Sequence, residues 1–174
     1  MKIISLVPIG RVDRDLLAWL AESLTRRLRV ACSLAPEALD VEPAHNPLRR
    51  QYHSTEILRL LLSQRPGNTW KVLGVTDLDL YIPILTFVFG EAQLSDSRAV
   101  VSTHRLRQEF YGLPIDADLL RERLLKEALH ELGHTYGLRH CLDYACVMSP
   151  SHGVERIDLK GTDFCAECLP ALAA

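Results

Sequence analysis

The stretch HELGHTYGLRHC, residues 130–141, places three histidines and a glutamate within eleven residues, with a cysteine directly after the last histidine. His130 and His134 are four residues apart, which on an α-helix separates two side chains by about 40° around the axis and about 6 Å along it. Two imidazoles so placed can converge on one metal ion. Gly137 favours the left-handed backbone conformation that ends helices, so the chain can turn there and bring His140 to the same ion.

This histidine pattern predicts a catalytic zinc site. Three neutral imidazoles leave one position of a tetrahedral zinc ion open for water. Glu131 is rotated by about 100° from His130, so its carboxylate flanks the ion and can take a proton from a zinc-activated water. The alternative is a solvated helix face with ordinary histidines, and it leaves the match of spacing to zinc chemistry unexplained.

The cysteines predict a second metal site. Four of the five crowd into the last 34 residues, and in a reducing compartment such clustering favours metal binding over disulfides. The pairs Cys141 with Cys146 and Cys165 with Cys168 resemble the two halves of a closed four-thiolate zinc site, which is structural. Adjacent residues His140 and Cys141 would then bind different ions. The alternatives are thiols that are merely buried or transiently paired, and a nucleic-acid-binding zinc ribbon, although the flanking residues are not basic.

Composition bounds the remaining possibilities. The chain has 174 residues, of which 48% are hydrophobic, and this size and composition suit one globular domain. Its net charge of −2 gives no reason to expect binding to nucleic acid or to an anionic membrane. No apolar run approaches the length of a membrane span, and the start, MKIISLVPIG, is interpreted as a buried strand in preference to a signal peptide. We therefore expect a cytoplasmic protein with reduced cysteines. Cys32 is interpreted as a small core residue, and His152 as a solvated loop residue that could face the cleft.

Hydrophobic periodicity predicts strands alternating with helices, and hence an α/β or α+β sandwich. The third helix, opened by Pro114 and by Asp116 or Asp118, should run to Gly137 and bury Leu125, Leu129, Leu132 and Tyr136 on the face away from the histidines. A loop is expected over 35–53 and a turn at 66–68. The expected strands cover 2–8, 30–34, 70–76, 84–90 and 98–103, and the other helices cover 13–28 and 54–64, the latter with Ser54 as its N-cap.

The motif HExxHxxGxxH followed by a methionine turn resembles the metzincin signature, and Met148 in CVMSP lies where that turn falls. With Cys141 directly after the third histidine, Cys146 and Met148 forming CxM, and a late CxxC at Cys165, the pattern resembles the archaemetzincins. This resemblance in motif covers residues 130–168.

The resemblance implies a zincin-like α+β fold with a twisted, mixed five-stranded sheet, one antiparallel edge strand, a long active-site helix and a small zinc-stabilised C-terminal subdomain. We expect one catalytic domain over 1–174, divided into subdomains at 1–137 and 138–174. Met148 would form an apolar floor beneath the catalytic zinc. The strand 84–90 would align an extended substrate, although an ordinary core strand explains that apolar run equally well.

These observations together predict a zinc metallopeptidase with two zinc ions per chain. Its substrates would be peptides or proteins, with an aminopeptidase-like specificity for small peptides implied by the resemblance, and the protein would be a monomer. Two alternatives stay open. One is a zinc-containing peptide- or protein-binding module with little turnover, against which the intact Glu131 argues. The other is a zinc hydrolase acting on something other than peptides.

Overall fold

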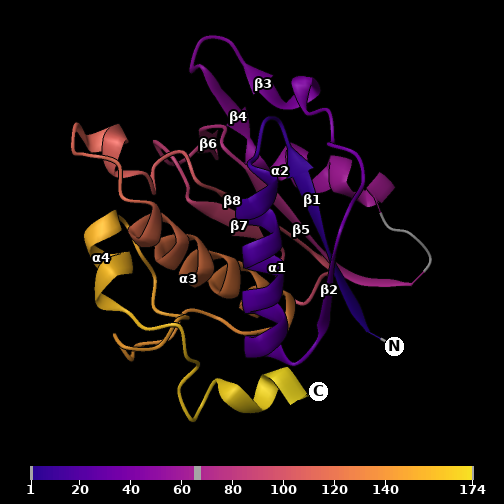
Figure 1. Cartoon of the computed structure of the whole chain (residues 1–174), viewed down its shortest axis with the longest axis vertical. Coiled ribbons are helices and arrows are strands. Elements are labelled where there is room, and N and C mark those ends of the chain that lie inside the picture. The colour runs from indigo at the N-terminus through magenta and orange to yellow at the C-terminus, as the bar shows by residue number, and fades with distance from the viewer. Residues whose placement is uncertain (1, 65–67, 174) are drawn as a thin grey trace.

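The computed structural model describes residues 2–64 and 68–173. In these ranges five strands form the main sheet, in the order β2-β1-β5-β8-β7 (Figure 1). The first four are parallel, whereas β7 runs antiparallel to β8 at the edge. This confirms the predicted mixed sheet with one antiparallel edge strand. The strands are β1 (Ile3–Ile9), β2 (Ala31–Leu34), β5 (Thr69–Thr76), β7 (Gly90–Ala92) and β8 (Arg98–Ser102).

Helices cover both faces of this sheet. The parallel strands are apolar on both sides, as expected of a sheet buried between helices. On one face Leu6 and Leu73 belong to a core shared with α1 (Arg14–Leu28) and α3 (Ala117–Thr135), which cross in front of the strands in Figure 1. On the other face Val7 and Val72 pack with α2 (Ser54–Leu60), which a 3₁₀ turn extends over Leu61–Gln64.

The first two helices follow the predicted spans, with one correction. Asp13 caps α1 by accepting a hydrogen bond from the Asp15 amide at 2.9 Å. Ser54 was predicted to cap α2, but it is the first residue of that helix and His53 occupies the cap position. The Ser54 hydroxyl is buried and hydrogen-bonds to the Tyr81 carbonyl and the Glu91 carboxylate instead. These tertiary hydrogen bonds keep the Ser54 hydroxyl from capping the helix.

The predicted loop over 35–53 was wrong in part, because the chain forms a second, smaller sheet there. Within the described ranges this sheet has the order β3-β4-β6 and lies beyond one end of the main sheet, at the top of Figure 1. Its strands have only two or three residues each, too few to show any periodicity in the sequence. They are β3 (His45–Asn46), β4 (Gln51–His53) and β6 (Leu80–Tyr81). The turn predicted at 66–68 falls largely outside the described residues.

The predicted strand over 84–90 was also wrong. Pro83 lies within a turn in which the Leu85 amide donates to the Ile82 carbonyl at 3.0 Å, and Val88 makes a single bridge to Leu80. Ile84, an apolar residue in this run, is 86% exposed. The edge strand therefore begins only at Gly90, and the preceding residues fold into a loop stabilised by side chains from elsewhere in the chain.

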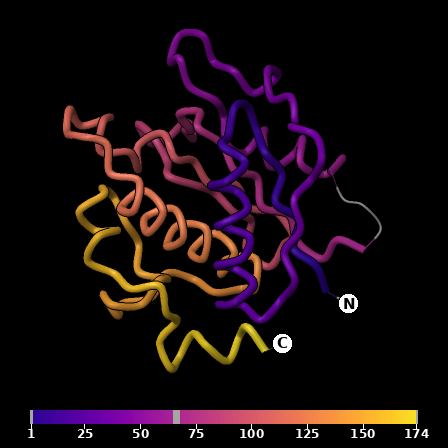
Figure 2. The backbone as a smooth tube through the Cα atoms, in the orientation of Figure 1, coloured from indigo at the N-terminus to yellow at the C-terminus, as the bar shows by residue number. Residues whose placement is uncertain are grey.

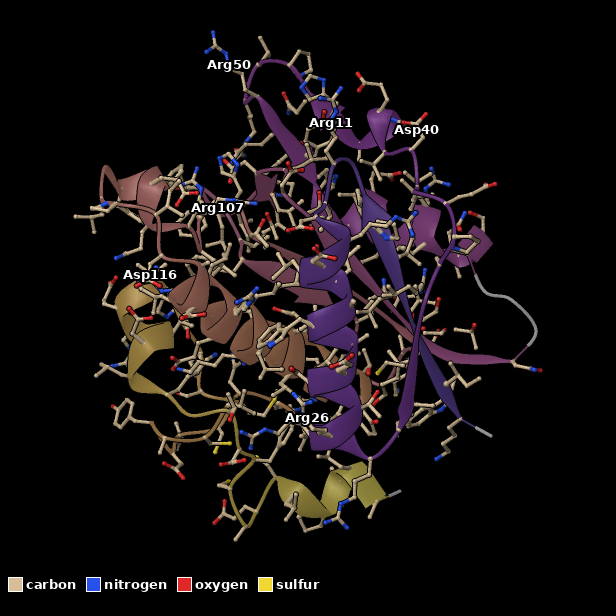
Figure 3. All side chains as sticks on the ribbon, in the orientation of Figure 1. Arg11, Arg26, Asp40, Arg50, Arg107 and Asp116 are labelled. Carbon is tan, nitrogen blue, oxygen red and sulfur yellow. The ribbon has the colours of Figure 1, made fainter. Side chains whose placement is uncertain are left out.

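The long helix α3 is the element that organises the site. Asp116 caps it by accepting from the Leu119 amide at 2.9 Å, and Figure 3 labels this residue at the start of the helix. Leu125, Leu129 and Leu132 are buried as predicted, but all the other residues from Arg123 to Gly133 are buried as well. This is because α3 packs on the sheet, on α1 and on α4 (Val154–Leu159), a helix that the sequence did not predict.

Buried charges attach the C-terminal segment to α3. Arg123 makes a bidentate ion pair with Asp158 at 2.7 and 2.6 Å, and the Lys126 ammonium donates to the Ile157 carbonyl at 3.1 Å. In Figure 2 the chain after α3, drawn in orange to yellow, gathers beside that helix and ends in a 3₁₀ turn, Leu169–Ala173. Among the described residues no helix is both long and apolar enough to span a membrane.

Candidate metal centres

His130 and His134 face each other on α3. The Nδ1 atom of His130 is 2.9 Å from the Val147 carbonyl, and that of His134 is 2.8 Å from the Leu138 carbonyl. A carbonyl only accepts hydrogen bonds, so each Nδ1 carries the proton and each Nε2 presents its lone pair. The two Nε2 atoms are 3.2 Å apart, so two lone pairs point into one space.

His140 completes the group through the predicted turn. The helix ends at Thr135, and Gly137 adopts the left-handed conformation with φ 90°. The Leu138 amide donates to the Gly133 carbonyl and the Gly137 amide to the His134 carbonyl, which together form a Schellman motif. The chain then brings the His140 ring to within 5.3 Å of His130 and 5.1 Å of His134, measured between ring centroids.

The three imidazoles fit a tetrahedral zinc ion. Their ligand nitrogens all lie within 4.8 Å of one another, and nitrogens about 2.0–2.1 Å from a tetrahedral zinc are about 3.3 Å apart. Burial lowers the pKa of each of the three rings, most strongly that of His130, and the neighbouring Lys160 ammonium adds to the effect. The neutral imidazoles that a metal requires are therefore favoured.

Glu131 lies beside this group on the wall of a cleft of about 360 Å³. Burial, and then the nearby Glu127 carboxylate, raise the pKa of Glu131 well above its usual range. A carboxylate so placed is suited to accept and return a proton. The cleft is lined by residues 85–90, by Pro150, Ser151 and His152, and by Glu127, His130, Glu131 and His140.

Two glycines make room for side chains of the site. A Cβ atom at Gly90 would lie 2.6 Å from the Val100 carbonyl and 2.7 Å from Cγ of Glu131, so the edge strand can approach the glutamate only without a side chain there. A Cβ atom at Gly133 would lie 2.3 Å from the sulfur of Met148. The structure thus places Met148, which is fully buried, against the helix turn between His130 and His134.

The four C-terminal cysteines also come together. Their Sγ atoms lie within 4.8 Å of one another, and Cys141 and Cys165 are 3.7 Å apart. The backbone amides of Met148 and Cys165 both point at the Cys146 sulfur, at 3.4 Å. Burial, and then the neighbouring thiols, raise the pKa of Cys168 strongly, so four thiolates need a cation among them. All four are free thiols in positions that fit a tetrahedral zinc ion.

The remaining predictions about single residues have different outcomes. Cys32 is half-buried, packs against the core and lies outside both clusters. His152 is exposed but lines the cleft. Two buried residues beside the histidines, Glu127 and its ion-pair partner Lys160, were not among the predicted site residues. The signal for Glu127 was present, because it precedes Glu131 by four residues and so shares its helix face. No local signal identified Lys160.

Comparisons with known proteins agree with this geometry. A family model described as Peptidase family M54 matches residues 49–174. The chain is 43% identical over 169 residues to an archaemetzincin of Methanocaldococcus jannaschii, covering 97% of this chain and 92% of that protein. It is 40% identical to an archaemetzincin of Pyrococcus furiosus, covering 97% and 91%.

Two solved structures show the same fold over nearly the whole chain. An archaemetzincin from Archaeoglobus fulgidus, complexed with malonate, superposes with a TM-score of 0.83 at 41% identity and covers 98% of this chain and 99% of that one. A zinc-dependent peptidase from Methanocorpusculum labreanum superposes with a TM-score of 0.89 at 32% identity, covering 97% and 99%.

Proposed function

The chain belongs to peptidase family M54, the archaemetzincins, and is a zinc metallopeptidase; from this premise we propose how its residues divide the chemistry. His130, His134 and His140 would hold the catalytic zinc through their Nε2 atoms. A zinc ion bound there supplies a Lewis acid that makes water more acidic and polarises the scissile carbonyl. The observation that carries the proposal is the pair of facing Nε2 atoms, 3.2 Å apart, beside a buried glutamate.

Glu131 would be the general base. Its side chain shares the cleft with His130 and His140, so it can take a proton from the attacking water and later deliver that proton to the departing amine. The raised pKa that burial and Glu127 produce favours holding the proton between these two events. Gly90 supports this role, because its missing side chain leaves space for the Glu131 carboxylate.

The cleft loop and the edge strand would align the substrate. Because residues 82–85 form a turn, the aligning role that we expected of a strand over 84–90 passes to the backbone from Phe89 into β7. This backbone lines the cleft at Phe89 and Gly90 and lies at the open edge of the sheet. An extended peptide can pair with such an edge through main-chain hydrogen bonds. The placement is typical of the metzincins, and we propose that clan for the protein.

The four cysteines would hold a second, structural zinc ion, giving two per chain. Cys141 follows His140 directly, and its amide donates to the Met148 carbonyl at 3.0 Å. A closed thiolate site at this point would hold the third histidine and the methionine turn in place. It would also organise residues 138–174 as a subdomain distinct from 1–137 within one catalytic domain.

We also propose a substrate specificity and a cellular location for the protein. The modest cleft volume of about 360 Å³ supports an aminopeptidase-like action on small peptides. A cytoplasmic location suits the five cysteines, which are all free thiols.

The first prediction tests the general base. Replacing Glu131 with Gln keeps the shape of the side chain and removes the base, so we expect kcat/KM for peptide hydrolysis to fall roughly 10²–10⁴-fold with the zinc content unchanged. Product formation from a peptide mixture, followed by mass spectrometry, measures the loss. The matched control is Glu122→Gln, on the same helix but outside the cleft. Hydrolysis that survives Glu131→Gln would contradict the mechanism, and a wild type that binds peptides without cleaving them would favour a binding module.

A further inference from the structure

Glu127 is a buried acid in the cleft to which the proposed mechanism assigns no direct role. Its side chain is 4% exposed and lies 2.8 Å from the Lys160 ammonium. The ammonium contacts the Oε1 atom, and this oxygen is fully buried. Burying two opposite charges carries a desolvation cost that a well-packed apolar pair would avoid, so the retention of this pair beside the cleft calls for an explanation.

The two members of this ion pair face different spaces. Glu127 lines the cleft, together with Glu131 and the histidines. Lys160 lines a separate groove, formed with Trp19 and Asp163, and donates to the Ser149 carbonyl at 3.1 Å. A group that enters the cleft can therefore contact the Glu127 carboxylate, whereas the Lys160 ammonium lies on the other side of that carboxylate.

The rest of the cleft suits a ligand with an apolar body and a donating end. Phe87, Val88 and Phe89 supply apolar wall, and no lysine or arginine belongs to the lining among the described residues. The Ser151 hydroxyl, also in the lining, is buried and has no partner within the described structure. An acidic side chain and a hydroxyl group without a hydrogen-bond partner thus line the same cleft.

We propose that the cleft face of the Glu127 carboxylate binds a cationic, hydrogen-bond-donating group of the peptide substrate. This inference rests on the proposed peptidase function. Two parts of a peptide carry such a group beside a scissile bond: a lysine or arginine side chain, and the free N-terminal amine. An apolar group in the same position would exclude water from the carboxylate without offering it a donor on the cleft side, which is how a polar site rejects an apolar analogue. An acidic group would be repelled by both Glu127 and Glu131.

A purely structural role for the ion pair is the competing explanation. Lys160 joins Glu127 on α3 to the Ser149 carbonyl next to the methionine turn, so the pair also holds two elements together. That role makes no distinction between charged and neutral peptides. The charge dependence of binding therefore separates the two explanations.

The experiment compares peptides that differ in one group. The zinc-loaded Glu131→Gln variant, which should bind without turnover, is titrated with fluorescently labelled peptides, and the Kd is read from anisotropy. Two changes are tested singly and together: acetylation of the N-terminus, and replacement of the arginine nearest the cleavage site by citrulline or leucine. Citrulline keeps the shape of arginine but has a carbonyl oxygen in place of one terminal nitrogen, so it loses the charge and part of the donor set.

We expect one of the two changes to weaken binding about tenfold. Loss on acetylation would identify the N-terminal amine as the bound group, and loss on replacing arginine would identify the side chain. Adding Glu127→Gln should abolish the difference between peptides, whereas adding Glu122→Gln, which alters an exposed partner of Lys126, should preserve it. The peptide series needs no change at Glu127, so it decides the question even if Glu127→Gln fails to fold.

The opposing outcomes are equally definite. Equal affinity for all the peptides, binding of none of them, or a charge preference that survives Glu127→Gln in folded protein would overturn the role of Glu127. Charge-dependent binding without hydrolysis by the wild-type enzyme would count against the proposed peptidase mechanism alone. Hydrolysis of all the peptides at equal kcat/KM would overturn the recognition by Glu127 and leave the peptidase mechanism intact.

Discussion

At the scale of single residues, the site depends on hydrogen bonds that set the tautomers of its histidines. The Val147 and Leu138 carbonyls accept from the Nδ1 atoms of His130 and His134, which leaves both Nε2 lone pairs directed into the space where we propose that the metal binds. Both carbonyls belong to the chain after the helix, in the region where His140, Cys141 and Met148 also lie. The residues that follow α3 therefore orient the ligands that α3 carries.

Gly133 provides a test of the packing beneath the histidines. Alanine there favours the helix by about 1 kcal/mol, but its Cβ would collide with the buried Met148 sulfur, and overpacking costs about 1–3 kcal/mol. We expect Gly133→Ala to lower the free energy of unfolding and to weaken zinc binding, as measured by urea titration and by metal competition.

The matched control for this substitution is a double-mutant cycle with Met148→Ala. Because the shorter side chain leaves room for the new methyl group, the double variant should lose less stability than the sum of the two single variants. Additive losses would show that Gly133 and Met148 do not share the space that the structure assigns them.

At the scale of elements, a polar network holds the wall of the cleft in place. Arg49, in the turn between β3 and β4, and Gln51, in β4, donate to the carbonyls of Leu85 and Thr86 at 2.7 and 2.9 Å. Gln51 also donates to Asp79, which makes a bidentate ion pair with Arg105 at 2.8 Å. The loop that replaced the expected strand is therefore supported by side chains that are distant in sequence.

This network predicts an acid-sensitive contribution to stability. Burial alone would raise the pKa of Asp79, but the hydrogen bonds and charge of Arg105, with Gln51, hold that pKa below its usual value. A lowered pKa means that the folded state binds fewer protons than the unfolded state, so the stabilisation is present above about pH 4 and is lost as the pH falls through the folded pKa.

Asp79→Asn should therefore reduce stability at neutral pH and flatten its decline in acid, as measured by urea unfolding between pH 7 and 3. Asp163→Asn, at an exposed carboxylate paired with Arg27, is the control, because surface pairs contribute little. If the wild type and Asp79→Asn lose stability in parallel on acidification, the ion pair does not carry this effect.

At the scale of the whole molecule, the two clusters of candidate metal ligands have different positions: the histidines join α3 to the C-terminal segment, whereas the four cysteines lie wholly within that segment. The core is shared between α3 and the segment, since Leu129 and Leu132 of α3 pack in the same cluster as Val147, Met148 and Ile157. Ion pairs from Arg123 and Glu127 of α3 hold the same segment at other points, and the four-thiol cluster connects residues within the segment itself. Loss of the two centres should consequently have different effects.

We expect two zinc ions per chain, counted by mass spectrometry of the metal against protein concentration. His134→Ala should leave one ion and abolish hydrolysis with little change in Tm. Cys168→Ser should also reduce the count but lower Tm markedly, because a structural zinc contributes folding free energy directly. A wild type with a single zinc ion, or two variants that lose the same stability, would remove the structural role from the thiol cluster.

Much of the site could be predicted because its chemistry is local. His130, Glu131, His134 and Gly137 act through helix geometry and one turn, and both are set by backbone sterics over a few residues. The strands β1, β5 and β8 and the helices α1 and α3 were predicted from periodicity for the same reason. The mixed sheet with its antiparallel edge came from the resemblance in motif.

The tertiary structure decided what depends on distant partners. Residues 84–87 are as apolar as a strand, yet they belong to a loop in which Arg49 and Gln51 bind the carbonyls of Leu85 and Thr86. The strands of the second sheet are too short to have a pattern. Glu127 and Lys160 meet only because the C-terminal segment packs on α3. Hydrophobic spacing determines which face of an element is buried. It does not determine which distant side chains lie against that face, and the cleft is formed by such distant contacts.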